Sequence, residues 1–170
     1  YVALYPAARE ESTALLAMGS IYYNEDDYAR AIEVFGRINP KKLTEEQADE
    51  YYFKYGYSYF LNGQYDNAKP FMTSIGYRSP YYAHAQYVLG YSYYRTEDYI
   101  QAKRHFTLIA DHQAYRSVLP FYLIQNEFNE GNYHYVRENG DAVLAIATGR
   151  RVLGLRRCRG GSWFHTARCG

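Results

Sequence analysis

The sequence predicts an all-α fold, an α-solenoid of antiparallel helix hairpins, on three observations. Hydrophobic residues make up 48% of the 170 residues and charged residues 22%, which is enough apolar material for a core. Small, aromatic and alanine positions recur at intervals of 34 to 37 residues. Polar turn residues separate the apolar segments at the same rhythm, so each period holds two helices joined by a turn.

Three segments of 21 residues, beginning at Leu15, Tyr52 and Gln86, align with one another. Each contains a glycine in its first half and a Tyr-x-x-Ala pattern in its second half. Two helices that cross closely need small residues at the crossing, so we expect each glycine to face the alanine of its own hairpin. The repeated residues are Gly19, Gly56 and Gly90; Tyr28, Tyr65, Tyr99 and Tyr133; and Ala31, Ala68 and Ala102.

A 34-residue period in helical patterns resembles the tetratricopeptide repeat, over most of residues 12–147. The resemblance implies a right-handed superhelix of about four repeats. A terminal repeat needs a polar cap, which the apolar first helix does not supply, so we expect a fragment of a longer bacterial array. The expected array spans 1–147, with repeats at about 12–45, 49–82, 83–116 and 117–147.

Local signals place the elements in order. Thr44 and Gln47 form a capping box that opens the third helix, and Ser79-Pro80 provides an N-cap and a first-turn proline for the fifth. In the fourth repeat Ile124 and Val136 replace the small pair, so its two helices should cross farther apart. The expected helices are 8–24, 27–38, 45–62, 65–76, 80–95, 98–111, 114–129 and 132–147.

The resemblance places the first helix of each hairpin on a concave face, where aromatic residues recur in this chain. Rings give a large contact area at low entropic cost, and phenols bond to a ligand backbone. We therefore expect a partner peptide in an aromatic groove, although packing between hairpins is an equal interpretation of any single ring. A glycan-binding module that uses the same rings is the alternative function. The expected groove residues are Tyr23, Phe53, Lys54, Tyr57, Phe60, Tyr87, Tyr91, Tyr94, Arg95, Phe121 and Phe128.

Other function classes have little support in the sequence. No nucleotide-binding or nucleophile motif occurs, and neither His105 nor His112 has a metal-ligating partner at usual spacing, so we expect no enzyme, cofactor or metal site. Residues 1–147 hold 13 basic and 18 acidic residues, a net charge of −5, which argues against nucleic acid. No apolar run approaches the roughly 18 residues of a membrane span. A protein or peptide partner is the expectation.

Residues 148–170 differ from the rest of the chain. They contain six arginines, no acid, no tyrosine, and both cysteines, Cys158 and Cys169. We interpret them as a basic tail foreign to the domain, with an arm for RNA or anionic lipid as the alternative. If the tail is ordered, Trp163 and Phe164 should contact a repeat surface, which leaves tail-mediated self-association open. The compartment is also open, with a bacterial cell envelope favoured over the cytoplasm because residues 1–147 lack cysteine.

Overall fold

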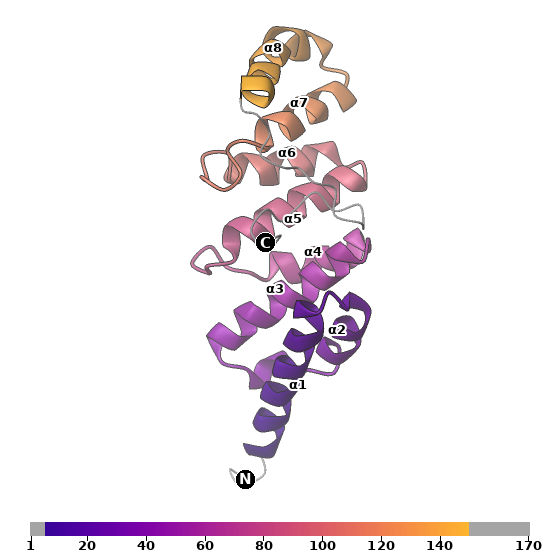
Figure 1. Cartoon of the computed structure of the whole chain (residues 1–170), viewed down its shortest axis with the longest axis vertical. Helices are drawn as coiled ribbons and strands as arrows, with labels where there is room; N and C mark the ends of the chain where they lie inside the picture. The colour runs from indigo at the N-terminus through magenta and orange to yellow at the C-terminus, as the bar shows by residue number, and fades with distance from the viewer. Residues whose placement is uncertain (1–5, 150–170) are drawn as a thin grey trace. The chain divides into compact units, whose positions relative to one another are not determined.

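The computed structural model describes residues 6–149, and all regular structure within them is helical (Figure 1). This confirms the all-α helical-repeat fold. The chain forms two compact units, residues 1–109 with helices α1 to α6 and residues 110–170 with α7 and α8. The elements are α1 (Pro6–Asn24), α2 (Tyr28–Phe35), the 3-10 turn η1 (Pro40–Lys42), α3 (Glu45–Leu61), α4 (Tyr65–Thr73), α5 (Tyr82–Arg95), α6 (Tyr99–Leu108), α7 (Leu119–Asn129) and α8 (Tyr133–Gly149).

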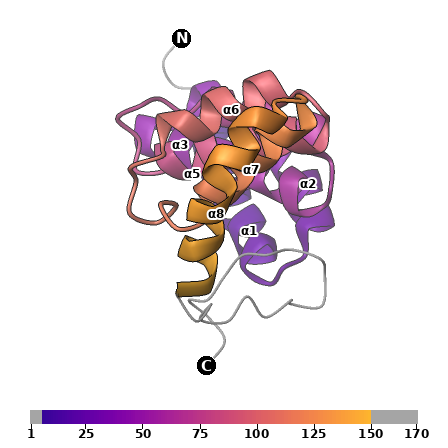
Figure 2. The same ribbon diagram turned by 90° about the horizontal axis from the view of Figure 1, so that it is seen from above.

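Within residues 1–109 the helices form three successive hairpins, α1 with α2, α3 with α4, and α5 with α6. The second helix of one hairpin packs on the first helix of the next, as α2 does on α3 and α4 on α5. The first helices also contact one another, α1 with α3 and α3 with α5, and Figure 2 shows α3 and α5 one behind the other. Residues that recur on the first helices therefore come together on one face of this unit.

The repeated glycines make close contacts inside their hairpins. A Cβ built on Gly90 would lie 2.5 Å from the Phe106 ring, and one on Gly19 would lie 2.5 Å from the Phe35 ring. Of the three glycines, only Gly56 lies close to the alanine of its own hairpin: a Cβ built on Gly56 would lie 3.3 Å from the Ala68 carbonyl oxygen. The expected pairing of glycine with alanine is thus incomplete. The alanines are fully buried, but the ring four residues later occupies the space that two of the glycines leave.

The four hairpin turns share one backbone conformation. Asp26, Gly63, Glu97 and Gly131 have φ angles of 59°, 76°, 63° and 81°, and each lies two residues before the repeated tyrosine. This left-handed region costs a residue with a Cβ about 1–2 kcal/mol, whereas glycine adopts it readily. Two of the turns therefore carry a local cost that a glycine would remove.

Replacing Gly63 by alanine should lower the free energy of unfolding by about 1 kcal/mol, and replacing Glu97 by glycine should raise it by about 0.5 kcal/mol or more. The matched control is Gly76→Ala, because an added Cβ at Gly76 meets no atom within 4 Å and its φ is not left-handed. Urea unfolding followed by circular dichroism measures all three variants. A Gly63→Ala protein as stable as Gly76→Ala would contradict the prediction.

Several helix ends differ from the sequence-based expectation. The Thr44–Gln47 capping box is confirmed, with both of its hydrogen bonds present. The expected start of the fifth helix at Pro80 is wrong: the Ser79 hydroxyl oxygen accepts from the Tyr81 N–H within a turn, and α5 begins at Tyr82. Helices α2, α4 and α6 end three residues earlier than expected, and α7 begins five residues later. Because α6 ends at Leu108, His112 does not share a helix face with His105.

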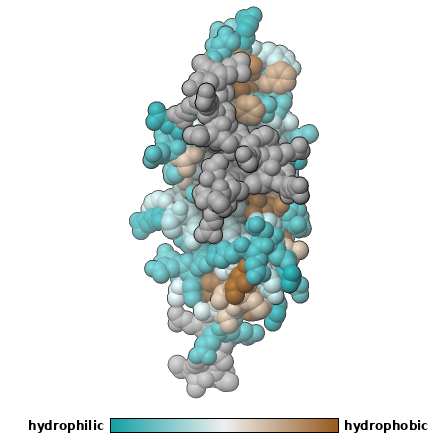
Figure 3. Space-filling view, viewed as in Figure 1, coloured by the Kyte–Doolittle hydropathy of each residue, from teal (hydrophilic) through white to brown (hydrophobic). Residues whose placement is uncertain are grey.

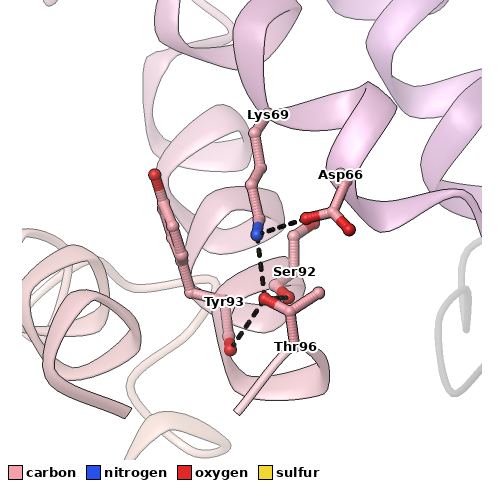
Figure 4. Close-up of polar contacts among 5 residues, drawn as sticks. All are labelled: Asp66, Lys69, Ser92, Tyr93 and Thr96. Atoms are coloured by element: carbon pink, nitrogen blue, oxygen red, sulfur yellow. Dashed lines mark hydrogen bonds and ion pairs between the residues drawn. The ribbon is translucent and has the colours of Figure 1, made fainter. Parts of the chain in front are cut away.

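One half-buried cation joins the second hairpin to the third (Figure 4). The Lys69 ammonium on α4 lies 2.8 Å from an Asp66 carboxylate oxygen and donates to the Thr96 hydroxyl at 2.8 Å. It also lies 4.3 Å from the centre of the Tyr93 ring. The Thr96 hydroxyl donates in turn to the Ser92 carbonyl oxygen at the end of α5. These contacts join α4 to the C-terminal end of α5.

The repeat boundaries, the handedness of the superhelix and the foreign origin of the tail stay predictions. The expected contacts of Trp163 and Phe164 lie outside the described residues.

Candidate functional site

Aromatic rings follow one another without a gap across the three hairpins of residues 1–109. The Tyr23 ring on α1 lies 6.2 Å from the Tyr57 ring on α3, measured between ring centres. Tyr57 lies 5.5 Å from Phe60, Phe60 lies 5.4 Å from Tyr91 on α5, and Tyr91 lies 6.4 Å from Tyr94. Two further rings, Phe53 and Tyr87, join this path. We call the set the aromatic ladder: Tyr23, Phe53, Tyr57, Phe60, Tyr87, Tyr91 and Tyr94.

The ladder has an inner and an outer part. Phe53, Phe60 and Tyr87 are buried, and each packs on a neighbour: Phe53 stacks on Tyr57 at 5.4 Å, and Tyr87 stacks on Tyr91 at 6.3 Å. The four remaining members, Tyr23, Tyr57, Tyr91 and Tyr94, are partly exposed. Packing therefore explains the buried rings, while the four tyrosines combine a supported ring with an accessible edge.

An edge-to-face ring pair recurs in every hairpin. The pair joins the last aromatic residue of the first helix to the tyrosine that opens the second, five residues later. Sequence reasoning found the column of tyrosines but not this contact, whose signal is the constant five-residue interval across each turn. The pairs, with centre distances and interplanar angles, are Tyr23–Tyr28 (6.1 Å, 69°), Phe60–Tyr65 (5.8 Å, 68°), Tyr94–Tyr99 (6.0 Å, 64°) and Phe128–Tyr133 (5.4 Å, 69°).

Two tetratricopeptide repeat family models match the chain, one over residues 13–39 and the other over residues 49–74. The chain contains tetratricopeptide repeats. Each matched segment begins within the first helix of a hairpin, α1 or α3, and ends just after the second, α2 or α4. Neither a curated protein nor a solved structure matches the sequence. Tetratricopeptide repeats generally mediate protein–protein interaction, so a protein-binding role follows from the repeats themselves.

Beside the aromatic ladder, the Lys54 ammonium is bound by two side chains of the array itself. Its ammonium lies 2.5 Å from a Glu50 carboxylate oxygen and donates to the Ser20 hydroxyl at 2.9 Å. Because Ser20 belongs to α1 and Lys54 to α3, this contact joins the first two hairpins. The charge of Lys54 is already balanced, which weakens the expectation that it meets an acidic ligand.

Arg95 lies at the exposed end of α5 and covers two rings. Its guanidinium carbon lies 5.0 Å from the centre of the Tyr65 ring and 5.9 Å from that of Tyr91, and Nη1 donates to the Tyr91 hydroxyl at 3.3 Å. Stacked guanidinium groups stabilise such arrangements while leaving N–H groups directed outward. Of the two cations expected in the groove, Arg95 is therefore the one that a ligand can approach.

The two remaining groove residues, Phe121 and Phe128, belong to the unit of residues 110–170. Both are exposed on α7. Phe121 lies 5.7 Å from Tyr122, and Phe128 forms the ring pair of its own hairpin. They stay predicted groove residues of the fourth repeat.

Burial raises the pKa of two phenols of the ladder, Tyr57 and Tyr23. It raises the pKa of Tyr57 to about 12. Burial also raises the pKa of Tyr23, and the pKa of Tyr28 is raised by burial and by the hydroxyl's hydrogen bond to the Asp26 carboxylate. At neutral pH the Tyr23 and Tyr57 hydroxyls can donate hydrogen bonds, which suits the carbonyl groups of a peptide, whereas the Tyr28 hydroxyl already donates to Asp26.

These shifts predict a loss of stability in alkali. Above pH 10 the unfolded chain loses phenol protons that the folded chain retains, so the free energy of unfolding should fall as the pH rises from about 10 to 12. Urea midpoints at pH 9, 10 and 11 measure the effect, and Tyr57→Phe should make the fall smaller. Absorbance at 295 nm that titrates completely near pH 10, while the helical signal persists, would contradict the prediction.

His105 on α6 packs against α5 and has a structural role there. Its Nδ1 lies 2.7 Å from the buried Gln86 side-chain oxygen, and its ring stacks on Tyr93 at 5.4 Å. Burial, together with the charge of Arg104, lowers its pKa. Among the described residues no group of three or more His, Cys, Asp and Glu could hold a metal ion. No described helix is both long and apolar enough to cross a membrane.

Proposed function

We propose that the tetratricopeptide repeat array is a non-catalytic scaffold that binds a peptide segment of a partner protein along the aromatic ladder. The observation that carries the proposal is the unbroken ring path from Tyr23 to Tyr94, in which partly exposed tyrosines rest on buried rings. Preformed aromatic surfaces bind with little loss of side-chain entropy, and tyrosine is enriched where interfaces gain most affinity.

The surroundings of the ladder favour an uncharged apolar segment. Of the two cations expected in the groove, Lys54 is neutralised by Glu50, which leaves Arg95 to meet an acidic peptide. Donating phenols and apolar rings suit side chains such as proline, leucine or an aromatic ring, with the peptide carbonyls accepting from the hydroxyls. The groove of the proposal consists of the aromatic ladder and Arg95, and Phe121 and Phe128 are the residues proposed for the fourth repeat by itself.

Selection from a random peptide library displayed on phage tests the proposal, with the whole chain as the immobilised protein. We expect enriched peptides to share two or more apolar residues, few acidic residues, and micromolar binding when synthesised. Oligosaccharides are the control, because rings also stack on sugars. Failure to enrich any sequence family, or displacement of enriched peptides by an oligosaccharide, would overturn the proposal.

A further inference from the structure

The turn between α1 and α2 is acidic and adjoins the first ring of the aromatic ladder. Tyr28, which opens α2, lies edge to face with Tyr23 at 6.1 Å, and its hydroxyl donates to the Asp26 carboxylate at 2.5 Å. Figure 3 shows mainly hydrophilic residues, around one hydrophobic area, where α1 and α2 lie. A shallow hollow at the turn is lined by Glu25, Asp26, Asp27, Tyr28, Ala29 and Asn62.

Glu25 and Asp26 give the hollow its negative charge. Both are exposed, whereas Asp27 caps α2 and pairs with Arg30. Asp26 keeps a left-handed φ of 59°, although glycine is the residue that adopts this conformation readily. Strained residues of this kind collect at binding sites. The hollow therefore combines carboxylates with a tyrosine ring, which together suit an ammonium or guanidinium group.

The next hairpin has a cation on the equivalent ring. The alignment of the three repeated glycines makes Tyr65 the equivalent of Tyr28, and Arg95 the equivalent of Leu61. The Arg95 guanidinium, at the end of α5, lies over the Tyr65 ring with its carbon 5.0 Å from the ring centre. At the end of α3 the same position is the uncharged Leu61. The Tyr28 ring therefore has no charged residue at the position from which Tyr65 receives its cation.

The turns differ in the opposite sense. The first turn is Glu25-Asp26-Asp27, and the second, before Tyr65, is the uncharged Asn62-Gly63-Gln64. The second hairpin thus has a cation from its neighbour and no acid in its turn, whereas the first has the acids and no such cation. This charge pattern points to a cation that comes from a partner.

We propose that the hollow at the first turn binds one lysine or arginine side chain of the segment that lies along the ladder. The inference rests on the proposed function, because the hollow adjoins Tyr23, the first ladder ring. The cation lies against the Tyr28 ring and has Glu25 and Asp26 as counter-charges. Arg95 repels a basic side chain at the opposite end of the ladder, so the segment binds in one direction.

A capped, library-selected ladder peptide tests the inference on the whole chain. Arginine is added through one glycine at its N-terminus or at its C-terminus, and citrulline replaces the arginine in two control peptides because it has a similar shape without the charge. Isothermal titration should show about three- to tenfold tighter binding for arginine over citrulline at one end only. Raising the salt should reduce this gain, because exposed charges are screened.

The double substitution Glu25→Gln with Asp26→Asn should remove the gain and leave the affinity for the unextended peptide unchanged. Asparagine adopts the left-handed conformation and keeps an oxygen that accepts from the Tyr28 hydroxyl, so the turn persists. The matched control, Glu10→Gln with Glu11→Gln, removes two exposed acids near the other end of α1 and should keep the gain.

Equal affinities of the arginine and citrulline peptides at both ends would overturn the inference. Equal gains at both ends, or a gain that the Glu25 and Asp26 variant keeps, would overturn it as well. In each of these cases the unextended peptide still binds, so the proposed function stands. Absence of binding by the unextended peptide would overturn the proposed function and the inference together.

Discussion

Replacing Gly90 by alanine should destabilise the chain strongly although it adds only one methyl group. The new Cβ would lie 2.5 Å from two atoms of the Phe106 ring, which is buried and cannot move without opening the hairpin. Overpacking of this kind costs about 1–3 kcal/mol, and Gly90→Leu should cost at least the upper value. Denaturant unfolding should show a lower midpoint for both variants, with leucine lower than alanine.

Gly140→Ala is the matched control, because this glycine also lies within a helix but an added Cβ meets no atom within 4 Å. Its higher helix propensity should stabilise the chain by up to about 1 kcal/mol. Combining Gly90→Ala with Phe106→Leu should recover part of the loss, because the smaller side chain makes room. If Gly90→Ala and Gly140→Ala have the same midpoint, the close contact between α5 and α6 does not exist.

Replacing Tyr57 and Tyr91 together by alanine should weaken binding of a ladder peptide by about a thousandfold. Truncation of a tyrosine at the centre of an interface costs roughly 2 kcal/mol, and here two are removed. The phenylalanine pair, Tyr57→Phe with Tyr91→Phe, keeps both rings and should lose far less, which separates the ring contact from the hydroxyl. Isothermal titration with a library-selected peptide measures the three affinities.

Tyr77→Ala is the control for this series, because its side chain is 72% exposed and lies between α4 and α5, outside the ladder. Circular dichroism should show unchanged helicity in all variants at the temperature of the titration. Equal affinities for the wild-type chain and the alanine pair would place the peptide elsewhere on the array.

The repeat spacing predicted most of the fold because it reflects local rules. Glycine and alanine mark the close crossing, Thr44 and Gln47 cap a helix, and polar residues mark each hairpin turn. The helix ends were less predictable. Ser79-Pro80 has the composition of a helix start, but the chain uses it for a turn. Propensity alone does not distinguish these two outcomes.

The site was predictable as a set of rings but not as a set of contacts. Periodicity places Tyr57 and Tyr91 on the same face, and their shared path through Phe60 follows from how α3 packs on α5. The ion pair of Lys54 with Glu50 is a contact between residues four apart on α3, which the sequence spacing could have indicated, whereas the contact of Lys54 with Ser20, 34 residues earlier, could not be assigned from it. Contacts between hairpins decide such details, and a single sequence does not encode their geometry locally.

Ring-selective NMR of the whole chain with labelled tyrosine tests the central claim most directly. On titration with a library-selected peptide, the ring signals of Tyr23, Tyr57, Tyr91 and Tyr94 should shift together with one affinity. The buried core tyrosine Tyr51 and the exposed Tyr77 should not shift. Shifts confined to tyrosines outside the ladder, at saturating peptide, would contradict the assignment of the ladder as the binding surface.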